Sequence, residues 1–72
     1  MIVSDIRDEL LTIMQTFNFS QTFVAKELSV TQGAIEHWLK KRRFPREQHY
    51  RKLLKFINKY KKYNIYEKNY KK

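Results

Sequence analysis

The chain has 72 residues, and its 16 Lys or Arg against 7 Asp or Glu give it a net charge of +9 at neutral pH. A chain this short folds as one small domain without room for a well-supported catalytic cleft, so we expect no enzyme and no catalytic residue. The absence of Cys excludes disulfides and thiolate metal sites, and a single Gly with a single Pro excludes a many-stranded β fold.

The N-terminal segment predicts a first helix that ends near Asn18, a residue type that closes helices in the left-handed conformation. Ser4 is the expected N-cap, with Asp5 and Asp8 in the first turn, where the helix dipole favours negative charge. One apolar face at helical spacing is expected to enter the core, and it consists of Ile6, Leu10, Ile13, Met14 and Phe17.

Two short helices are predicted next, joined by a tight connection over Ser29–Thr31. Ser20 is the expected N-cap of the first helix, over about residues 21–28, and Thr31 is the expected N-cap of the second. The inward-facing residues are Val24, Ala25 and Leu28 in the first helix, and Ala34, Ile35, Trp38 and Leu39 in the second. The opposite side of the second helix is polar and consists of Gln32, Gly33, Glu36, His37 and Lys40.

The sequence KKRRFP, residues 40–45, is expected to form a basic loop, with Pro45 in the first turn of a fourth helix. The apolar stripe of that helix is expected at Tyr50, Leu53, Leu54, Ile57 and Tyr60. Residues 1–57 would form the folded domain. The basic extension that follows, residues 58–72, is rich in Tyr and Lys, and we expect it to prolong the helix, form a short fifth one or remain partly disordered.

The charge is distributed unevenly along the chain. Residues 1–39 carry a net charge of −3, whereas residues 40–72 carry +12. This polarity suits a polyanionic partner, either a nucleic acid or an anionic membrane surface. No apolar run approaches the roughly 18 residues of a membrane span, and MIVSDIRDEL does not resemble a signal peptide, so we expect a cytoplasmic protein of a bacterium or a phage-infected cell.

Residues 21–40, QTFVAKELSVTQGAIEHWLK, have the spacing of a DNA-binding helix-turn-helix. Counted from Gln21, the fourth, eighth, tenth, fifteenth and eighteenth residues are apolar and the fifth is small: Val24, Leu28, Val30, Ile35, Trp38 and Ala25. Together with KKRRFP and REQHYRKLLKF, this segment resembles the Cro/cI-like (XRE-type) phage-repressor helix-turn-helix family over residues 20–57, in its all-helical Cro-like subgroup. The resemblance implies an all-α, lambda-repressor-like bundle of four to five helices.

The resemblance also implies a function, that of a sequence-specific regulator of transcription, a Cro-like repressor of double-stranded DNA with residues 32–40 in the major groove. It implies a homodimer on a two-fold operator, formed in solution or only on DNA, with no membrane partner. The base-reading residues would be Thr31, Gln32, Gly33, Glu36, His37 and Lys40. The phosphate-contacting residues would be Ser20, Gln21, Lys41, Arg42 and Arg43. Glu36 has an alternative role as the ion-pair partner of Lys40.

Two positions depart from the family pattern. Ser29 stands where Gly is common in the turn, at a cost of roughly 1 kcal/mol if the residue is left-handed. Phe23 stands at a position that is usually polar, and we expect it to pack on Phe19 or on the tail, or to contact a partner.

Two other functions remain compatible with the sequence. One is the DNA-binding antitoxin of a toxin–antitoxin pair, with Phe23 or the tail contacting the toxin. The other is a cationic module that binds membranes or proteins through residues 50–66, although it leaves the spacing of residues 21–40 unexplained. His37 and His49 lack further ligands at usable spacing, so we expect no metal, and neither a cofactor nor a small-molecule ligand is implied.

Overall fold

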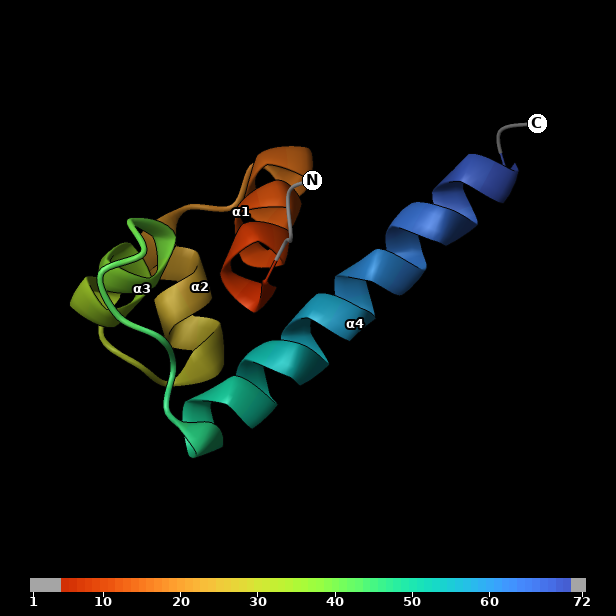
Figure 1. Cartoon of the computed structure of the whole chain (residues 1–72). Coiled ribbons are helices and arrows are strands. Elements are labelled where there is room, and N and C mark those ends of the chain that lie inside the picture. The colour runs from red at the N-terminus through yellow and green to blue at the C-terminus, as the bar shows by residue number, and fades with distance from the viewer. Residues whose placement is uncertain (1–4, 71–72) are drawn as a thin grey trace, which may run out of the picture.

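Four helices make up the protein in the computed structural model, which describes residues 5–70, with side chains as far as Lys62 (Figure 1). They are α1 (Ile6–Phe17), α2 (Gln21–Leu28), α3 (Gln32–Leu39) and α4 (Glu47–Tyr70). No strand occurs within residues 5–70, so the prediction of an all-α fold is confirmed.

Asp5 is the N-cap of α1 through a reciprocal pair of hydrogen bonds. Its carboxylate accepts from the backbone N–H of Arg7 at 2.7 Å, and its own N–H donates to the Asp8 carboxylate at 3.0 Å. The predicted cap, Ser4, lies outside the described residues, and the prediction is wrong by one position. Asp8 stands three residues after Asp5 and can return a hydrogen bond, whereas Arg7 stands three residues after Ser4 and has no side-chain acceptor.

Hydroxyl side chains begin the two short helices, as the sequence predicts. Ser20 Oγ accepts a hydrogen bond from the N–H of Phe23 at 3.0 Å, and Thr31 Oγ1 accepts one from the N–H of Ala34 at 3.1 Å. These bonds satisfy amide groups that have no partner inside the helix. They matter because α2 and α3 have only eight residues each, so the terminal residues make up a large fraction of each helix.

Left-handed residues end α1 and α2. Asn18 has φ 59° and donates its N–H to the carbonyl of Met14, which confirms the predicted stop. Ser29 has φ 56° and donates its N–H to the carbonyls of Ala25 and Lys26. A Cβ in this region crowds the following carbonyl, so Ser29 bears a strain that a glycine would avoid.

A single core takes side chains from all four helices. Its buried members are Ile6, Leu10, Ile13, Met14, Val24, Ala25, Leu28, Ile35, Trp38, Leu53, Phe56 and Ile57. The predictions for the first three helices agree with this set, with Phe17, Ala34 and Leu39 partly buried at its edge. In α4 one assignment is wrong, because Leu54 is 40 % exposed and Phe56 is buried instead.

An aromatic cluster packs where the connection after α1 meets α2 and α4. Ring centroids lie 5.5 Å apart for Phe17 and Phe19, and 4.7 Å apart for Phe19 and Phe23. From α4, Tyr60 lies 5.0 Å from Phe19 and 4.9 Å from Phe56. Phe23 therefore packs on Phe19, one of its predicted alternatives, while 37 % of it stays exposed.

The loop between α3 and α4 ends later than predicted. Because α4 begins at Glu47, Pro45 precedes the helix instead of occupying its first turn. The residue is buried all the same. The carbonyl of Arg46 accepts the N–H of Tyr50 at 2.7 Å, which is the bond that the residue before a helix normally makes.

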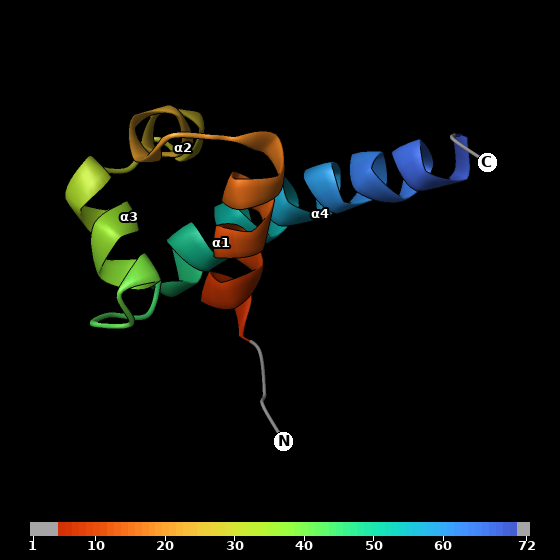
Figure 2. The same cartoon turned by 90° about the horizontal axis from the view of Figure 1, so that it is seen from above.

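Both α3 and α4 pack against α1 and α2. In Figure 1, α3 lies at one side of the bundle, whereas α4 runs past α1 and α2 and extends away from α3. Figure 2 shows the same projection of α4 from above. The helix is continuous to Tyr70, so the extension prolongs the fourth helix and forms no fifth one within the described residues.

Replacing Ser29 with Gly is expected to stabilise the protein by roughly 0.5–1 kcal/mol. The change removes the Cβ strain at φ 56°, while the greater freedom of Gly in the unfolded chain offsets part of the gain. Urea unfolding followed by circular dichroism measures the difference. Ser20→Gly is the matched control, because it removes a cap at φ −84° and should cost about 0.3 kcal/mol. A Ser29→Gly protein that is no more stable than the original contradicts the assignment of strain.

Candidate nucleic-acid interface

The rotation of α3 about its axis is set by two buried side chains. Ile35 is fully buried and Trp38 is 3 % exposed, which confirms Trp38 as a core residue. Because these side chains turn one side of the helix inward, the polar side is left at the surface. Of the predicted base-reading residues on this surface, four are exposed and Glu36 is half-exposed; the four are Thr31, Gln32, Gly33 and Lys40.

The beginning of α2 is tied to the beginning of α3. The Thr22 hydroxyl donates a hydrogen bond to the side-chain oxygen of Gln32 at 3.3 Å. Ser20 and Gln21, two predicted phosphate contacts, immediately precede Thr22 and so lie next to the exposed end of α3. Sequence reasoning missed Thr22, because no spacing rule pairs it with a residue of the following helix.

Glu36 and Lys40 form an ion pair across one turn at the surface of α3. The Lys40 ammonium donates to the Glu36 carboxylate at 2.9 Å, so the alternative role predicted for Glu36 is present. This hydrogen bond holds the pKa of Glu36 below its usual value. Both side chains stay about half exposed, at 45 % for Glu36 and 54 % for Lys40, so both remain accessible to a ligand.

His37 is less accessible than its neighbours on α3. The residue is half-buried, and its Nδ1 is buried without a hydrogen-bond partner in the described part of the chain. Its backbone carbonyl accepts the N–H groups of Arg42 at 2.9 Å and Arg43 at 3.4 Å. The main chain of His37 therefore shapes the start of the basic loop.

The cations of the basic loop differ in whether they already have a partner within the protein. Lys41 has φ 64°, and its ammonium lies 2.9 Å from the Asp8 carboxylate of α1. Arg42 and Arg43 are exposed, and neither guanidinium has a hydrogen bond or an ion pair among the residues that the structure describes. Two of the three predicted phosphate-binding cations of the loop are thus available to an anion, whereas Lys41 already has a carboxylate partner.

Arg7 connects the basic loop to α1, although Arg7 and Arg43 are 36 residues apart in the sequence. Its guanidinium donates to the Arg43 carbonyl at 3.1 Å and lies 5.0 Å from the centroid of the Phe44 ring. Asp5 accepts from the same guanidinium at 2.7 Å, and Phe44 stacks on Tyr50 with centroids 5.9 Å apart. We call these five residues the loop clamp. It holds the backbone beside the free guanidinium groups in place, which lowers the entropy lost when they bind.

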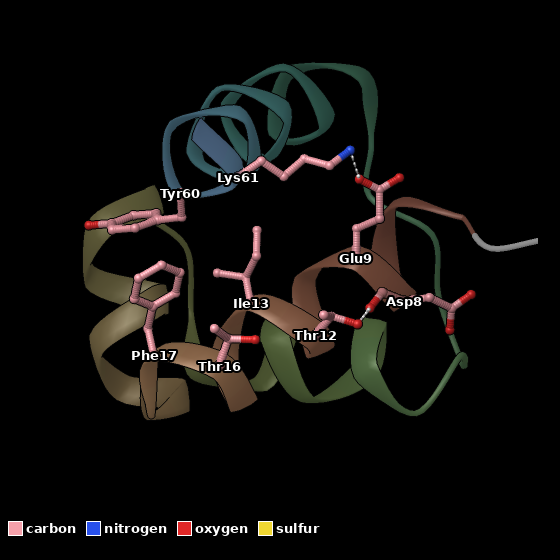
Figure 3. Close-up of a pocket in the computed structure, with 8 residues that line it drawn as sticks. All are labelled: Asp8, Glu9, Thr12, Ile13, Thr16, Phe17, Tyr60 and Lys61. Carbon is pink, nitrogen blue, oxygen red and sulfur yellow. Dashed lines mark hydrogen bonds and ion pairs between the residues drawn. The ribbon is translucent and has the colours of Figure 1, made fainter. Parts of the chain in front are cut away.

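A groove of about 220 Å³ lies between α1 and α4 (Figure 3). The residues that line it are Asp8, Glu9, Thr12, Ile13, Thr16, Phe17, Tyr60 and Lys61, none of them from α3. Glu9 and Lys61 pair across it at 3.0 Å, and the Thr12 hydroxyl donates to the Asp8 backbone carbonyl at 3.1 Å. Among the described residues, no three His, Cys, Asp or Glu side chains gather in a way that could hold a metal ion. The surface of α3 with its basic loop is the stronger candidate site.

No protein-family model matches this chain, and no curated protein or solved structure matches it at a significant level. Within residues 5–70, no helix combines the length and the apolar character that crossing a membrane requires. The candidate site is therefore defined by geometry and charge alone.

Acid should weaken the fold in part through Asp5 of the loop clamp. Hydrogen bonds from Arg7 lower the pKa of Asp5 from 3.8 to about 2. Because the folded-state pKa is depressed, the contribution of Asp5 to stability is complete above about pH 4 and is lost as the pH falls towards 2. Asp8 is shifted in the same direction, because the Lys41 ammonium donates to it.

We expect the free energy of unfolding, measured in urea from about pH 6 to about pH 2, to fall less steeply below pH 4 in Asp5→Asn than in the original protein. The other carboxylates titrate in both proteins, so the difference between the two curves isolates Asp5. Glu27→Gln is the control, because Glu27 has no ion pair among the described residues. Parallel curves for Asp5→Asn and the original protein would rule out the contribution of Asp5.

Proposed function

We propose that this protein is a sequence-specific, duplex-DNA-binding regulator of transcription, a Cro-like repressor that inserts α3 into the major groove. The observation that carries the proposal is the polar, exposed face of α3, whose rotation is fixed by Ile35 and Trp38, followed directly by a loop with two unpaired guanidinium groups. A helix of about 10–12 Å diameter fits a major groove about 12 Å wide.

Base reading is assigned to the polar side of α3. Gln32 can bond bidentately to adenine, and its carboxamide already has an orienting contact from Thr22. At Gly33, a Cβ would meet nothing closer than Thr31 Oγ1 at 3.9 Å. The fold has room for a side chain there, which supports the role of Gly33 as a place where bases or sugars approach the backbone. Glu36, with its charge offset by Lys40, would accept from a cytosine amine.

Phosphate binding is assigned mainly to Arg42 and Arg43, since neither guanidinium forms a hydrogen bond or an ion pair within the described residues, although the charge of Arg42 also helps to lower the pKa of Glu36. The Ser20 oxygen accepts a capping bond, which leaves its hydroxyl proton available to a phosphate at the N-terminus of α2. Gln21 lies beside it. Lys41 would contact a phosphate only in competition with Asp8, so it contributes less than the sequence predicts. Such contacts position a protein on DNA without reading its sequence.

The cationic membrane module is a weaker alternative for this chain. A helix that lies in a membrane surface must expose its apolar face. In α4, that face includes Leu53 and Ile57, which are fully buried, and Phe56, which is 7 % exposed. Binding to lipid through this face would require the bundle to open, so the distribution of apolar side chains favours a nucleic-acid partner.

Selection of bound duplexes from a random pool is the experiment that tests this function. We expect enrichment of one short motif arranged as two inverted half-sites, because a homodimer presents two copies of α3. An inverted repeat separated by about one helical turn would also give the distance between the two α3 helices. A pool that remains random after selection, with binding competed equally by any duplex, rejects sequence-specific regulation.

Gln32→Ala and Arg42→Ala should affect DNA binding in different ways. Loss of a bidentate base contact should lower the preference for the selected site over random DNA by about 1–3 kcal/mol. Loss of Arg42 should weaken binding to both duplexes alike and flatten the slope of log affinity against log salt by about one unit. Fluorescence anisotropy at several salt concentrations measures both quantities. Equal losses of preference in the two variants would undo this division of roles.

A further inference from the structure

A second basic surface lies on α4, outside the site described above. Lys52, Lys55, Lys59 and Lys62 are all exposed. They recur at intervals of three, four and three residues, which places them on one side of the helix. We call these four residues the lysine stripe. At about 1.5 Å of rise per residue, the stripe is about 15 Å long.

The side chains of the lysine stripe are not part of the hydrophobic core. Leu53, Phe56 and Ile57 lie between its members in the sequence and are buried in the bundle, whereas the lysines stay exposed, three of them beside the end of α2. Lys59 lies 5.4 Å from the centroid of the Tyr60 ring, a contact that leaves its positive charge in place. The stripe is therefore a solvent-facing row of ammonium groups.

No lysine of the stripe forms an ion pair within the described residues. Among the described residues, the carboxylates with a cationic partner are Asp5, Asp8, Glu9, Glu36 and Glu47, and none of those partners belongs to the stripe. Glu27 lines a groove of about 280 Å³ together with three of the lysines, but it forms no ion pair within the described residues. One carboxylate beside four ammonium groups leaves this side of α4 strongly positive.

The lysine stripe and the polar surface of α3 lie on different helices, and these helices diverge. Each of the two helices packs against α1 and α2, and they meet each other through the rings of Trp38 and His49, whose centroids lie 6.0 Å apart. In both views α4 runs away from α3 (Figures 1 and 2). Because the two helices diverge, a straight duplex seated on α3 would not run along the length of α4. An anion bound to the stripe is consequently a separate molecule or a distant segment of the same one.

Duplex DNA is the polyanion that suits the stripe best. Over about 15 Å of its axis, a duplex carries about nine phosphate charges. Lysine ammonium groups on flexible stems contact such a backbone without demanding a fixed geometry. An anionic membrane would attract the same charges, but the apolar side chains that would anchor α4 in it are buried.

We propose that the lysine stripe binds a second segment of duplex DNA while α3 holds the first, so that one molecule bridges two duplexes. This role rests on the proposed binding of DNA by α3. Each phosphate contact raises affinity about eightfold for a tenfold drop in salt concentration. The loss of two lysines from the stripe at about 0.1 M salt should therefore reduce bridging by more than about tenfold.

The test measures capture of a labelled duplex by the full chain bound to a different duplex on beads, beside ordinary binding to one duplex. We expect the original protein to bridge. Lys55→Gln/Lys59→Gln should bridge more than about tenfold less while binding a single duplex within about threefold of the original. The control is Lys26→Gln/Lys61→Gln, which removes two exposed lysines that lie outside the stripe, and with Lys61 it also removes the ion pair to Glu9. It should bridge like the original protein.

Each other outcome overturns the proposal in a recognisable way. Binding of one duplex without bridging rejects the second site and leaves DNA binding by α3 intact. Bridging that survives Lys55→Gln/Lys59→Gln but disappears in Arg42→Gln/Arg43→Gln assigns it to two copies of α3 in a dimer. Stripe-dependent binding to vesicles of anionic lipid, with no bridging of duplexes, assigns the stripe to membranes. Failure to bind any duplex rejects the stripe and the proposed function together.

Discussion

All four helices depend on one small shared core. Leu10, Val24, Ile35 and Leu53, one from each helix, are each fully buried in it. Helices of eight residues, such as α2 and α3, are too short to be stable alone in water. They persist because their apolar sides are covered by α1 and α4. The direction in which α3 presents its polar side is thus a property of the whole bundle.

Folding brings acidic residues of the N-terminal half of the chain into contact with basic residues of the C-terminal half. The acidic N-terminal half does not form an acidic face opposite a basic one, because Asp8 pairs with Lys41 and Glu9 pairs with Lys61. These pairs remove two cations of the basic half from the available charge. What remains unpaired in the described residues is concentrated in the loop after α3 and along the lysine stripe. Folding therefore separates the free positive charge into two places.

Much of the local chemistry was predictable from the sequence, although the cap of α1 and the start of α4 were each placed wrongly by a residue or two. Asn18, Ser20 and Thr31 end or begin helices as predicted, because a cap needs only the residues next to it. The face of α4 was not fully predictable. The sets containing Leu54 or Phe56 both fit a period of 3.6 residues, and only packing against the other helices selects Phe56.

The candidate site was predictable to the same extent. The polar side of α3 follows from its periodicity, and its exposure follows from the burial of Ile35. The attachment of the basic loop does not, because Arg7 and the Arg43 carbonyl are 36 residues apart and no local rule joins them. The ion pair between Lys41 and Asp8 could not be predicted for the same reason. Long-range polar contacts such as these are decided by the tertiary fold.

The placement of Trp38 also gives the protein a built-in optical reporter. It is the only tryptophan in the chain, and 97 % of it is shielded from solvent in the core, with its ring 6.0 Å from that of His49. Its emission consequently senses whether α3 is docked on the bundle. Because the indole lies on the side of α3 that faces inward, a ligand on the outward side would change that signal only by moving the helix itself.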